Sequence, residues 1–463
     1  MIPGHIFREY DIRGLHATEL TDAVAEAVGR AFGTLIREGE PAGGSACAVA
    51  LGRDVRPSSE RLAGAVERGI RAAGVEVERV GVVPTPALYY AVVARSLAGG
   101  LQVTGSHNPP EFNGFKMTRR RLPLFGAEIQ TMRERIARDD LGHPPRAREA
   151  QDRPILEAYA AMLVERLRSP TPLTVVMDCG NGCAGTVVPQ AFERMGHRVI
   201  PLYAELDGTF PNHLPDPTVP ALLQSLIAEV QRTGADLGIG FDGDADRIGA
   251  VDGRGRMVFG DQLLALFARD VLTRVPGAEI IFDVKCSQGL SEDIVAHGGR
   301  PSMWKTGHSL IKSRLHETGA PLAGEMSGHM FFSEGFFGFD DALFAAGRLL
   351  RYVAGSGRAL AELVDSIPRY HATPETRLAC PDDRKFAVVE ELKRMFALRH
   401  RVIDIDGLRV EFGDGWGLVR ASNTQPALVV RFEARTAERL AEIRAQFMEP
   451  LARLGVGEAA VGH

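Results

Sequence analysis

The alternation of strand-like and helix-like segments is the feature of this sequence that most constrains its fold. In the first third of the chain, apolar runs typical of buried strands occur at residues 46–51, 75–83 and 101–104. Segments with helical periodicity lie between them at residues 58–73 and 86–94. This alternation predicts α/β layers, in which helices cover a parallel or mixed sheet.

The same order of elements starts again twice beyond a polar stretch at residues 144–153. The three segments have similar lengths but no obvious residue-level repeat, so we expect repeated structure rather than repeated sequence. We predict strands at 173–177, 198–202, 237–241, 279–284 and 301–304, and helices near 155, from 220, and at 261–272, 289–296 and 308–318.

The last part of the chain, from about residue 368, has a different pattern. One helical segment at 384–398 is followed by closely spaced strands at 402–412, 416–421 and 427–433, and then by a final helix. This order is typical of a separate α+β domain. A length of 463 residues is enough for two to four domains in total.

Composition and charge exclude several functional classes. The 54 Lys and Arg residues against 59 Asp and Glu residues give a formal charge of −5, which argues against binding to nucleic acid or an anionic membrane. No stretch reaches the ~20 apolar residues of a membrane helix. Charged residues from Arg8 onwards are unlike a signal peptide, and the five scattered cysteines are typical of reduced thiols. We therefore expect a cytoplasmic protein, and small anionic ligands remain possible because a negative total charge still allows local basic pockets.

Three aspartates directly after the strand expected at 237–241 form the most specific motif. Asp242, Asp244 and Asp246 alternate with small residues, and a looped backbone can direct their carboxylates toward one point. Converging carboxylates repel one another unless a cation joins them, and oxygen ligands suit Mg²⁺. The alternative is a solvated acidic turn, because Asp-Gly sequences are common in turns. The apolar strand before the motif and Arg247 after it favour the metal site.

A second motif follows the strand expected at 101–104. Gly105 and two prolines restrict this loop, which would hold the hydroxyl of Ser106 at the carboxyl edge of the sheet, where α/β domains bind ligands. Ser106 is therefore a candidate nucleophile, although a hydroxyl that only caps a turn is the alternative. Lys116 follows closely and brings a cation to the same edge.

Two further motifs have the composition of a sugar phosphate site. In extended backbone, Glu325, Ser327 and His329 would share one face and could bind sugar hydroxyls, although a buried polar strand end is the alternative. Beyond the strand ending at 419, a cation, two hydroxyls and an amide could cradle an anion, although a solvated turn would look similar: Arg420, Ser422, Asn423 and Thr424. Lys285 and residues 304–308 end successive strands, so we expect them to lie near each other.

These motifs, in this order, resemble the α-D-phosphohexomutase superfamily, in particular its bacterial phosphomannomutase/phosphoglucomutase family. The resemblance covers essentially the whole chain, from the Phe-Arg-Glu-Tyr-Asp-Ile-Arg-Gly sequence at residues 7–14 to the Arg420 loop. It implies three similar mixed α/β domains and a C-terminal α+β domain around a central cleft, with the last domain mobile. With the motif positions, we expect domains at residues 1–150, 151–253, 254–367 and 368–463, each of which supplies one loop to the site.

The resemblance also implies a role for each motif residue. Ser106 is similar to the phosphoserine of the family and, with Asp242, Asp244 and Asp246, to its Mg²⁺ ligands. The expected groups that assist proton and charge movement are His107, Lys116 and Arg247. The expected substrate-binding residues are Tyr10, Arg13, Lys285, His308, Glu325, Ser327, His329, Arg420, Ser422, Asn423 and Thr424. The chain departs from the family pattern at Ala245, where relatives often have Gly, and at Gln425, where a small hydroxyl residue is common.

The implied reaction is the reversible interconversion of hexose 6-phosphate and hexose 1-phosphate, of mannose or glucose, through a 1,6-bisphosphate that also acts as activator. We expect a monomer that binds sugar phosphates. Phosphoglucosamine mutase is the nearest rival, but its members typically have Gln where this chain has Met326, and Met cannot hydrogen-bond an amino sugar as an amide does. A Mg²⁺-dependent phosphatase and a non-enzymatic sugar phosphate sensor are rivals from two different functional classes.

Overall fold

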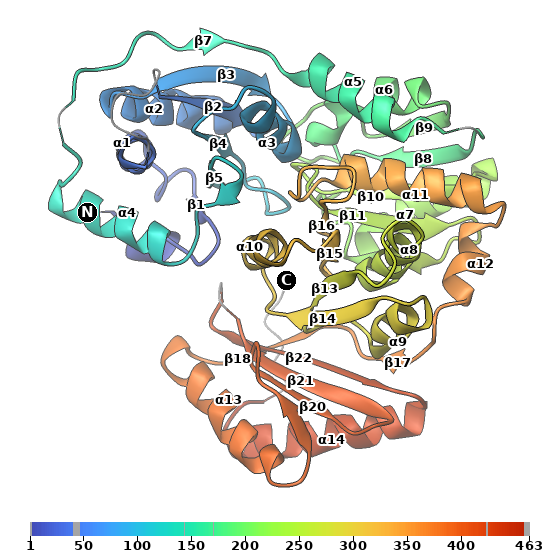
Figure 1. The fold of residues 1–463 in the computed structure, drawn as a ribbon. Helices are drawn as coiled ribbons and strands as arrows, with labels where there is room; N and C mark the ends of the chain where they lie inside the picture. The colour runs from blue at the N-terminus through green and yellow to red at the C-terminus, as the bar shows by residue number, and fades with distance from the viewer. Residues whose placement is uncertain (1, 40–46, 143, 170, 423–424, 458–463) are drawn as a thin grey trace.

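A computed structural model describes residues 2–39, 47–142, 144–169, 171–422 and 425–457. It shows four domains in chain order, three with helices on both sides of a mixed sheet and a last one with an antiparallel sheet (Figure 1). None of the described helices is both long enough and apolar enough to cross a membrane.

The first domain is built on a sheet with the strand order β1-β5-β4-β2-β3-β7, with β6 beside β5. Helices α1, α2 and α4 share a core on one face, and α3 covers the other. The helices α1 and α2 can approach closely because Gly29 has no Cβ; a Cβ at this position would lie only 2.2 Å from the backbone oxygen of Val66. The elements are η1 Gly4–Ile6, β1 Ile12–Leu15, α1 Asp22–Glu38, β2 Ala48–Arg53, α2 Ser59–Ala72, β3 Glu76–Val82, α3 Thr85–Ala94, β4 Gly99–Val103, β5 Phe112–Arg119, β6 Leu122–Pro123, α4 Ala127–Arg138 and β7 Gln151–Asp152.

The second and third domains have sheets in the orders β12-β11-β10-β8-β9 and β14-β13-β15-β16. The second contains α5 Leu156–Leu167, β8 Thr174–Asp178, η2 Cys183–Thr186, α6 Val188–Arg194, β9 Arg198–Leu202, η3 Pro220–Leu223, α7 Gln224–Thr233, β10 Leu237–Phe241, β11 Ile248–Asp252 and β12 Met257–Val258. The third contains α8 Gly260–Leu272, β13 Glu279–Asp283, α9 Gln288–Ala296, β14 Arg300–Trp304, α10 His308–Thr318, β15 Leu322–Gly324, β16 Met330–Phe332, α11 Ala342–Ser356 and α12 Leu360–Asp365.

The expected structural repeat is confirmed by the sheet topology. In each of the first three domains, the first core strand pairs in parallel with the second and the third, and the third pairs antiparallel with the fourth. The four core strands are β2, β3, β4 and β5 in the first domain, β8, β9, β10 and β11 in the second, and β13, β14, β15 and β16 in the third. Each domain therefore has a hairpin loop at the same place, between its third and fourth core strands.

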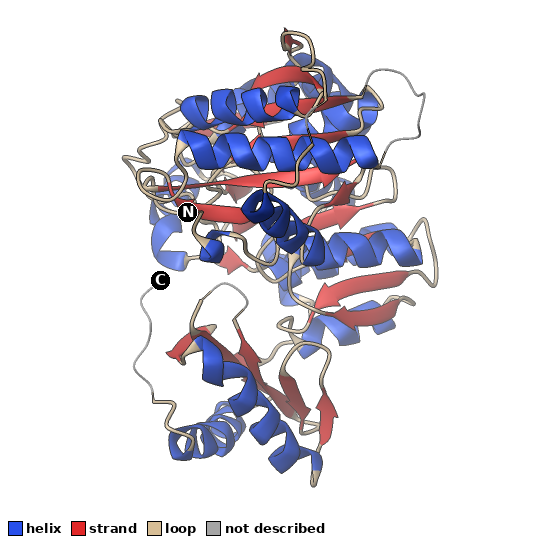
Figure 2. Ribbon diagram, turned by 90° about the vertical axis from the view of Figure 1, so that its left-hand side faces the viewer, coloured by secondary structure: helices blue, strands red, loops and turns tan. Residues whose placement is uncertain are grey.

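The last domain has the strand order β17-β22-β21-β20-β19, with β18 also paired to β22. Both of its long helices cover the face that points away from the other domains (Figures 1 and 2). Side chains alternate along β21, so that Val419 packs under these helices while Trp416 and Leu418 contact Val284 of the third domain. The elements are β17 His371–Ala372, β18 Thr376–Ala379, α13 Asp382–Ala397, β19 Arg401–Ile403, β20 Leu408–Glu411, β21 Gly415–Ala421, β22 Ala427–Ala434 and α14 Ala437–Arg453.

Three details differ from the sequence-based expectations. The segment 402–412 is not one strand but a hairpin of β19 and β20, which turns at Gly407, where φ is +82°. The helix expected from residue 220 starts as the 3-10 turn η3 and becomes α-helical at Gln224. The first sheet continues to β7 at residues 151–152, beyond the expected end of that domain, because β7 pairs with β3.

Candidate active site

The predicted functional loops occupy the repeated hairpin position in the first three domains. The Ser106 loop connects β4 to β5, the aspartate loop connects β10 to β11, and the Glu325 loop connects β15 to β16. Antiparallel strands need only a short connection, so each loop is held at both ends by its sheet. The fold thus presents the equivalent edge of each sheet to a common site.

A buried arginine shapes the Ser106 loop. The guanidinium of Arg56 donates hydrogen bonds to the backbone oxygens of Ser106, Asn108, Pro109 and Phe112, at 2.5 to 3.0 Å. Its partner Asp54 also accepts from the backbone N–H of Gly105, at 3.1 Å. Ser106 has φ of +50°, in the left-handed region, which is uncommon for serine. The chain reaches this conformation because the loop is bound from behind by a fully buried ion pair.

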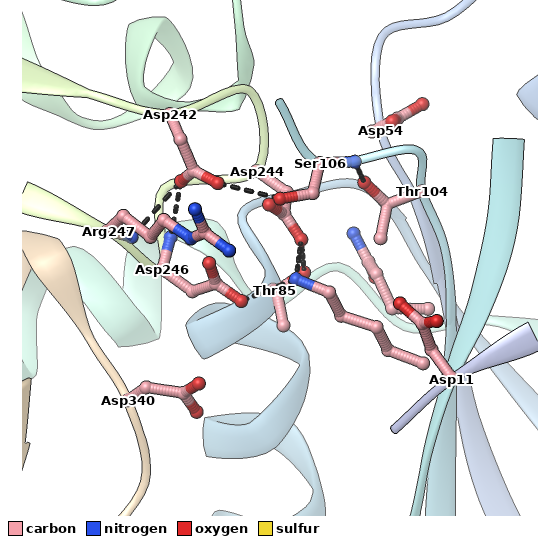
Figure 3. A network of polar contacts seen from close by, with 12 residues as sticks. Asp11, Asp54, Thr85, Thr104, Ser106, Asp242, Asp244, Asp246, Arg247 and Asp340 are labelled. Atoms are coloured by element: carbon pink, nitrogen blue, oxygen red, sulfur yellow. Dashed lines mark hydrogen bonds and ion pairs between the residues drawn. The ribbon is translucent and has the colours of Figure 1, made fainter. Parts of the chain in front are cut away.

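The Ser106 hydroxyl lies directly beside the aspartate loop. Its Oγ donates to Asp242 Oδ2 at 2.8 Å (Figure 3). The same Oγ lies 3.1 Å from His107 Nδ1. Burial, with the charges of nearby cations, holds the pKa of His107 well below its usual range, so this ring is neutral and available as a hydrogen-bond partner. The Ser106 loop of the first domain therefore contacts the aspartate loop of the second domain.

The three aspartates converge as expected. Ligand atoms of Asp242, Asp244 and Asp246 lie within 4.8 Å of one another, and all three side chains are fully buried. The Oδ1 atoms of Asp244 and Asp246 have no hydrogen-bond partner among the described residues, although they are buried. Burial and the two neighbouring carboxylates raise the pKa of Asp242 well above its usual value. Buried carboxylate oxygens without hydrogen-bond partners, held close enough to repel one another, are suitable ligands for a hard divalent cation.

Lys116 and Thr85 complete this centre from the first domain. Lys116 Nζ lies 2.7 Å from Asp244 Oδ2 and 2.5 Å from Asp246 Oδ2. Burial lowers the pKa of Lys116, but the attraction of the aspartates outweighs it and leaves the pKa well above its usual value. The Thr85 hydroxyl donates to Asp244 Oδ2 at 2.5 Å, and its N–H donates to the backbone oxygen of Asp244 at 2.9 Å.

The Glu325 loop is a tight turn, so the extended backbone expected for residues 325–329 is wrong. The N–H of Glu325 donates to the backbone oxygen of His329 at 2.9 Å, and Gly328 has φ of +88°. The turn is needed because β15 and β16 pair antiparallel. Glu325 and Ser327 still point together, with Ser327 Oγ 3.3 Å from Glu325 Oε2, and Glu325 Oε1 accepts from the N–H of Gly307 at 2.6 Å.

His329 lies against the aspartate loop. Arg247 Nε donates to His329 Nε2 at 3.0 Å, and the ring of His329 stacks on that of His308, with centroids 5.2 Å apart. Tyr10 meets His308 edge-on and donates its hydroxyl to the backbone oxygen of Thr306 at 2.8 Å. The structure thus brings residues of the first three domains together at one place.

Carboxylates hold the predicted phosphate-binding cations. Lys285 Nζ is 3.0 Å from Glu375 Oε2, and Arg420 Nε donates to Asp406 Oδ2 at 2.9 Å. Asp406 also accepts from the N–H of Thr306 at 3.0 Å, so it bridges the third and last domains. The expected proximity of Lys285 to the 304–308 segment follows from the parallel pairing of β13 and β14.

The remaining predicted residues are distributed around this centre. Arg13 donates to Asn108 Oδ1 at 2.9 Å and to Asp11 Oδ2 at 2.5 Å, so it lies at the Ser106 loop. Ser422 is buried, and its Oγ accepts from the N–H of Gln425 at 3.1 Å. Asn423 and Thr424 lie outside the described residues.

Several site residues were missed from the sequence. They support the predicted residues rather than forming motifs of their own: Asp54, Arg56, Thr85, Asp340, Glu375 and Asp406. Asp54 and Arg56 follow β2 and could have been found from the rule that ligand sites lie at carboxyl ends of strands. Asp340 precedes Asp341, the N-cap of α11, so from the sequence both residues are explained by the start of a helix.

Comparison with known proteins agrees with this arrangement. The models for phosphoglucomutase/phosphomannomutase α/β/α domains I, II and III match residues 4–142, 157–255 and 259–370, and the model for the C-terminal domain matches residues 375–449.

Individual relatives match over nearly the full length of the chain. The phosphomannomutase/phosphoglucomutase of Pseudomonas aeruginosa is 47% identical over 452 residues, which cover 97% of this chain and 96% of that protein. The phosphoglucomutase of Neisseria gonorrhoeae is 43% identical and covers 96% of this chain and 95% of its own length. The crystal structure of a phosphoglucomutase/phosphomannomutase family protein from Burkholderia thailandensis has a TM-score of 0.92 at 42% identity and covers 99% of this chain and 100% of that one. Together with the site geometry, these matches show that the chain belongs to the phosphoglucomutase/phosphomannomutase family of the α-D-phosphohexomutase superfamily.

Proposed function

We propose that this protein is a phosphohexomutase that interconverts hexose 6-phosphate and hexose 1-phosphate, of mannose or glucose, through a phosphoserine at Ser106. The observation that carries the proposal is the position of the Ser106 hydroxyl, 2.8 Å from Asp242 Oδ2 at the edge of the buried aspartate cluster. A serine phosphate at this point would need a strong positive partner. The family relatives with phosphomannomutase and phosphoglucomutase names support the same activity.

Mg²⁺ is the proposed metal, held by Asp242, Asp244, Asp246 and the phosphate on Ser106. When bound, it offsets phosphate charge as the phosphoryl group transfers. Lys116 already lies at Asp244 and Asp246, so it supplies a fixed cation at the same point. Phosphoryl transfer depends mostly on positioning and charge stabilisation, which these buried groups provide.

The substrate is proposed to bind with its second phosphate at the far side of the site. Arg420 and Ser422 would hold this phosphate, with Asn423, Thr424 and Lys285, while Glu325 and Ser327 would bind the sugar hydroxyls. Transfer from Ser106 to the free hydroxyl forms a new P–O bond as the Ser106–phosphate bond breaks, and gives the 1,6-bisphosphate. This intermediate then turns end for end and returns its other phosphate to Ser106.

The carboxylates Glu375 and Asp406 suggest how the protein keeps its phosphate-binding cations in place before substrate binds. They neutralise Lys285 and Arg420, and substrate phosphate would replace them as the partner. Because the Lys285–Glu375 pair joins the third domain to the last, its exchange couples substrate binding to movement of the last domain, as the family resemblance implies.

Neutral hexose phosphates are the proposed substrates rather than amino sugars. Met326 follows Glu325 in the sugar loop, and its sulfur contacts the guanidinium of Arg431. A thioether cannot donate or accept strongly enough to select an amino group. We also propose domain boundaries near residues 150, 253 and 367, a monomeric state and a cytoplasmic location.

Intact-protein mass spectrometry tests the proposal. We expect incubation with glucose 1,6-bisphosphate to add one phosphate, about 80 Da, to the wild-type protein and none to Ser106→Ala. A coupled assay should show isomerisation of glucose 1-phosphate that is lost in Ser106→Ala. A phosphatase would instead release inorganic phosphate from glucose 1-phosphate in step with substrate loss. A sensor would keep its cellular effect in Ser106→Ala, which would contradict the proposed mechanism.

A further inference from the structure

Asp340 is a buried carboxylate beneath the candidate site with no role among the motif residues. Its side chain is 0% exposed. The residue lies in the segment between β16 and α11, where its backbone forms an isolated antiparallel β-bridge with Phe331 of β16. Figure 3 shows it on the far side of Asp246 from Ser106. Burial of an ionised carboxylate is costly unless cations or hydrogen bonds compensate its charge. Groups of this kind are therefore expected around Asp340.

Among the described residues, a lysine and two histidines pair with Asp340, and a second carboxylate faces the same histidine, because Asp246 Oδ1 lies 3.6 Å from His329 Nδ1. Lys312 Nζ of α10 lies 2.6 Å from Oδ1. On the other side, Oδ2 lies 3.2 Å from His329 Nδ1 and 3.6 Å from His308 Nδ1. Burial raises the pKa of Asp340, but the groups around it, chiefly the Lys312 cation, lower it by more, so the net pKa is well below the usual value. Asp340 is therefore a carboxylate whose charge is compensated by Lys312 and whose second oxygen faces the histidine pair.

The contacts of His329 determine which ring nitrogen carries the proton. Arg247 Nε–H can only donate, and it points at Nε2 at 3.0 Å, so Nε2 must accept. A neutral imidazole that accepts at Nε2 carries its proton on Nδ1, the atom beside Asp340. The Arg247 donor at Nε2 thus selects the tautomer, and the ionised Asp340 carboxylate 3.2 Å from Nδ1 favours the same one through its charge, although the two atoms do not meet hydrogen-bond geometry.

We propose that Asp340 is a positioning residue that fixes the ring orientation and tautomer of His329. It keeps the lone pair of Nε2 directed toward Arg247 and the aspartate loop, where the Ser106 phosphate transfers. Lys312 lets the carboxylate remain ionised in this buried place. The catalytic consequence rests on the function proposed above, whereas the tautomer itself does not.

The adjacent residue offers a matched control. Asp341 is also buried, at 1% exposed, but it serves the fold: it caps α11 by accepting from the N–H of Phe344 at 2.8 Å, and it accepts from Tyr159 Oη. These contacts direct its carboxylate toward α11 and α5 rather than toward the histidine pair. Asp341→Asn therefore makes the same chemical change, at the next residue, without altering the partners of His329.

The experiment compares Asp340→Asn with Asp341→Asn in the full-length protein. We expect Asp340→Asn to lower kcat by about 10²-fold or more with KM within about threefold, as when a carboxylate that orients a histidine is neutralised. Asp341→Asn should lower the melting temperature yet leave kcat within about twofold. Equal kcat losses in the two variants, or no loss in Asp340→Asn, would overturn the proposal.

Two measurements separate positioning from a general loss of structure. In a His329→Ala background, Asp340→Asn should cost little further activity, because its effect acts through the missing ring; additive losses would contradict the proposal. Long-range ¹H–¹⁵N spectra of histidine-labelled protein, with the His329 signals assigned by their absence in His329→Ala, should show Nδ1–H in the wild type. Asp340→Asn should shift the ring toward Nε2–H. An unchanged tautomer would refute the proposal even if the protein had no mutase activity.

Discussion

Gly243 of the aspartate loop lies against the backbone of the Ser106 loop. A Cβ built on Gly243 would lie 2.4 Å from the backbone oxygen of Ser106, and ordinary contact begins at about 3.4 Å. The aspartate loop cannot easily move away, because the N–H of Cys183 donates a hydrogen bond to the backbone oxygen of Gly243 at 2.9 Å. Gly243→Ala must therefore separate the two loops by about 1 Å.

The expected effect follows from this displacement. A shift of about 1 Å in the reacting groups costs about 10²-fold in rate, which corresponds to about 2.7 kcal/mol of transition-state stabilisation. The residues proposed to bind the sugar and its second phosphate lie in other loops, so substrate affinity should change little. We therefore expect Gly243→Ala to lower kcat about 10²-fold, with KM within about threefold of the wild-type value.

A coupled assay that follows glucose 1-phosphate to glucose 6-phosphate measures both constants. Gly249→Ala is the control, because its Cβ would lie 2.5 Å from the backbone oxygen of Pro217, a similar clash that stays within the second domain. This control should lower the melting temperature but retain most of kcat at a temperature where the protein is folded. The reasoning is refuted if folded Gly243→Ala keeps kcat within threefold of wild type, or if both variants lose kcat equally.

Two further predictions concern charge. The Glu375 pKa is lowered to about 2, chiefly by Lys285, so this pair stabilises the fold fully above pH 4.5 and progressively less as the pH falls toward 2. Urea unfolding should therefore give Glu375→Gln a free energy of unfolding up to about 3 kcal/mol below that of the wild type at pH 6. This difference in free energy should become smaller at pH 3. A difference that does not depend on pH would contradict the prediction. Mg²⁺ should raise the melting temperature of the wild-type protein by at least about 2 °C, since it relieves repulsion in the aspartate cluster, and EDTA should remove activity until Mg²⁺ is restored. Asp242→Asn should abolish the Mg²⁺ shift, and a rise of equal size in this variant, or with NaCl of matched ionic strength, would rule out binding at the cluster.

Local sequence patterns were enough to predict the domain architecture and the main loops. The strand at 237–241 and the helix at 308–318 agree with β10 and α10, because apolar periodicity reflects burial in a sheet or against it. The aspartate cluster was predictable as well, since its three carboxylates lie within five residues. In contrast, 402–412 looked continuous because both β19 and β20 are apolar on one face, and the turn at Gly407 carries only a weak signal.

The sequence by itself indicated the candidate residues for the chemistry and predicted that they end strands of a repeated α/β unit. Only the tertiary structure decided which groups hold them in place. Arg56 binds the Ser106 loop, Asp340 faces His329, and Asp406 joins Arg420 to Thr306, and none of these pairs is signalled by sequence spacing. The physical reason is that periodicity reports whether a side chain is buried, whereas the partner of a buried charge depends on how whole domains pack against one another.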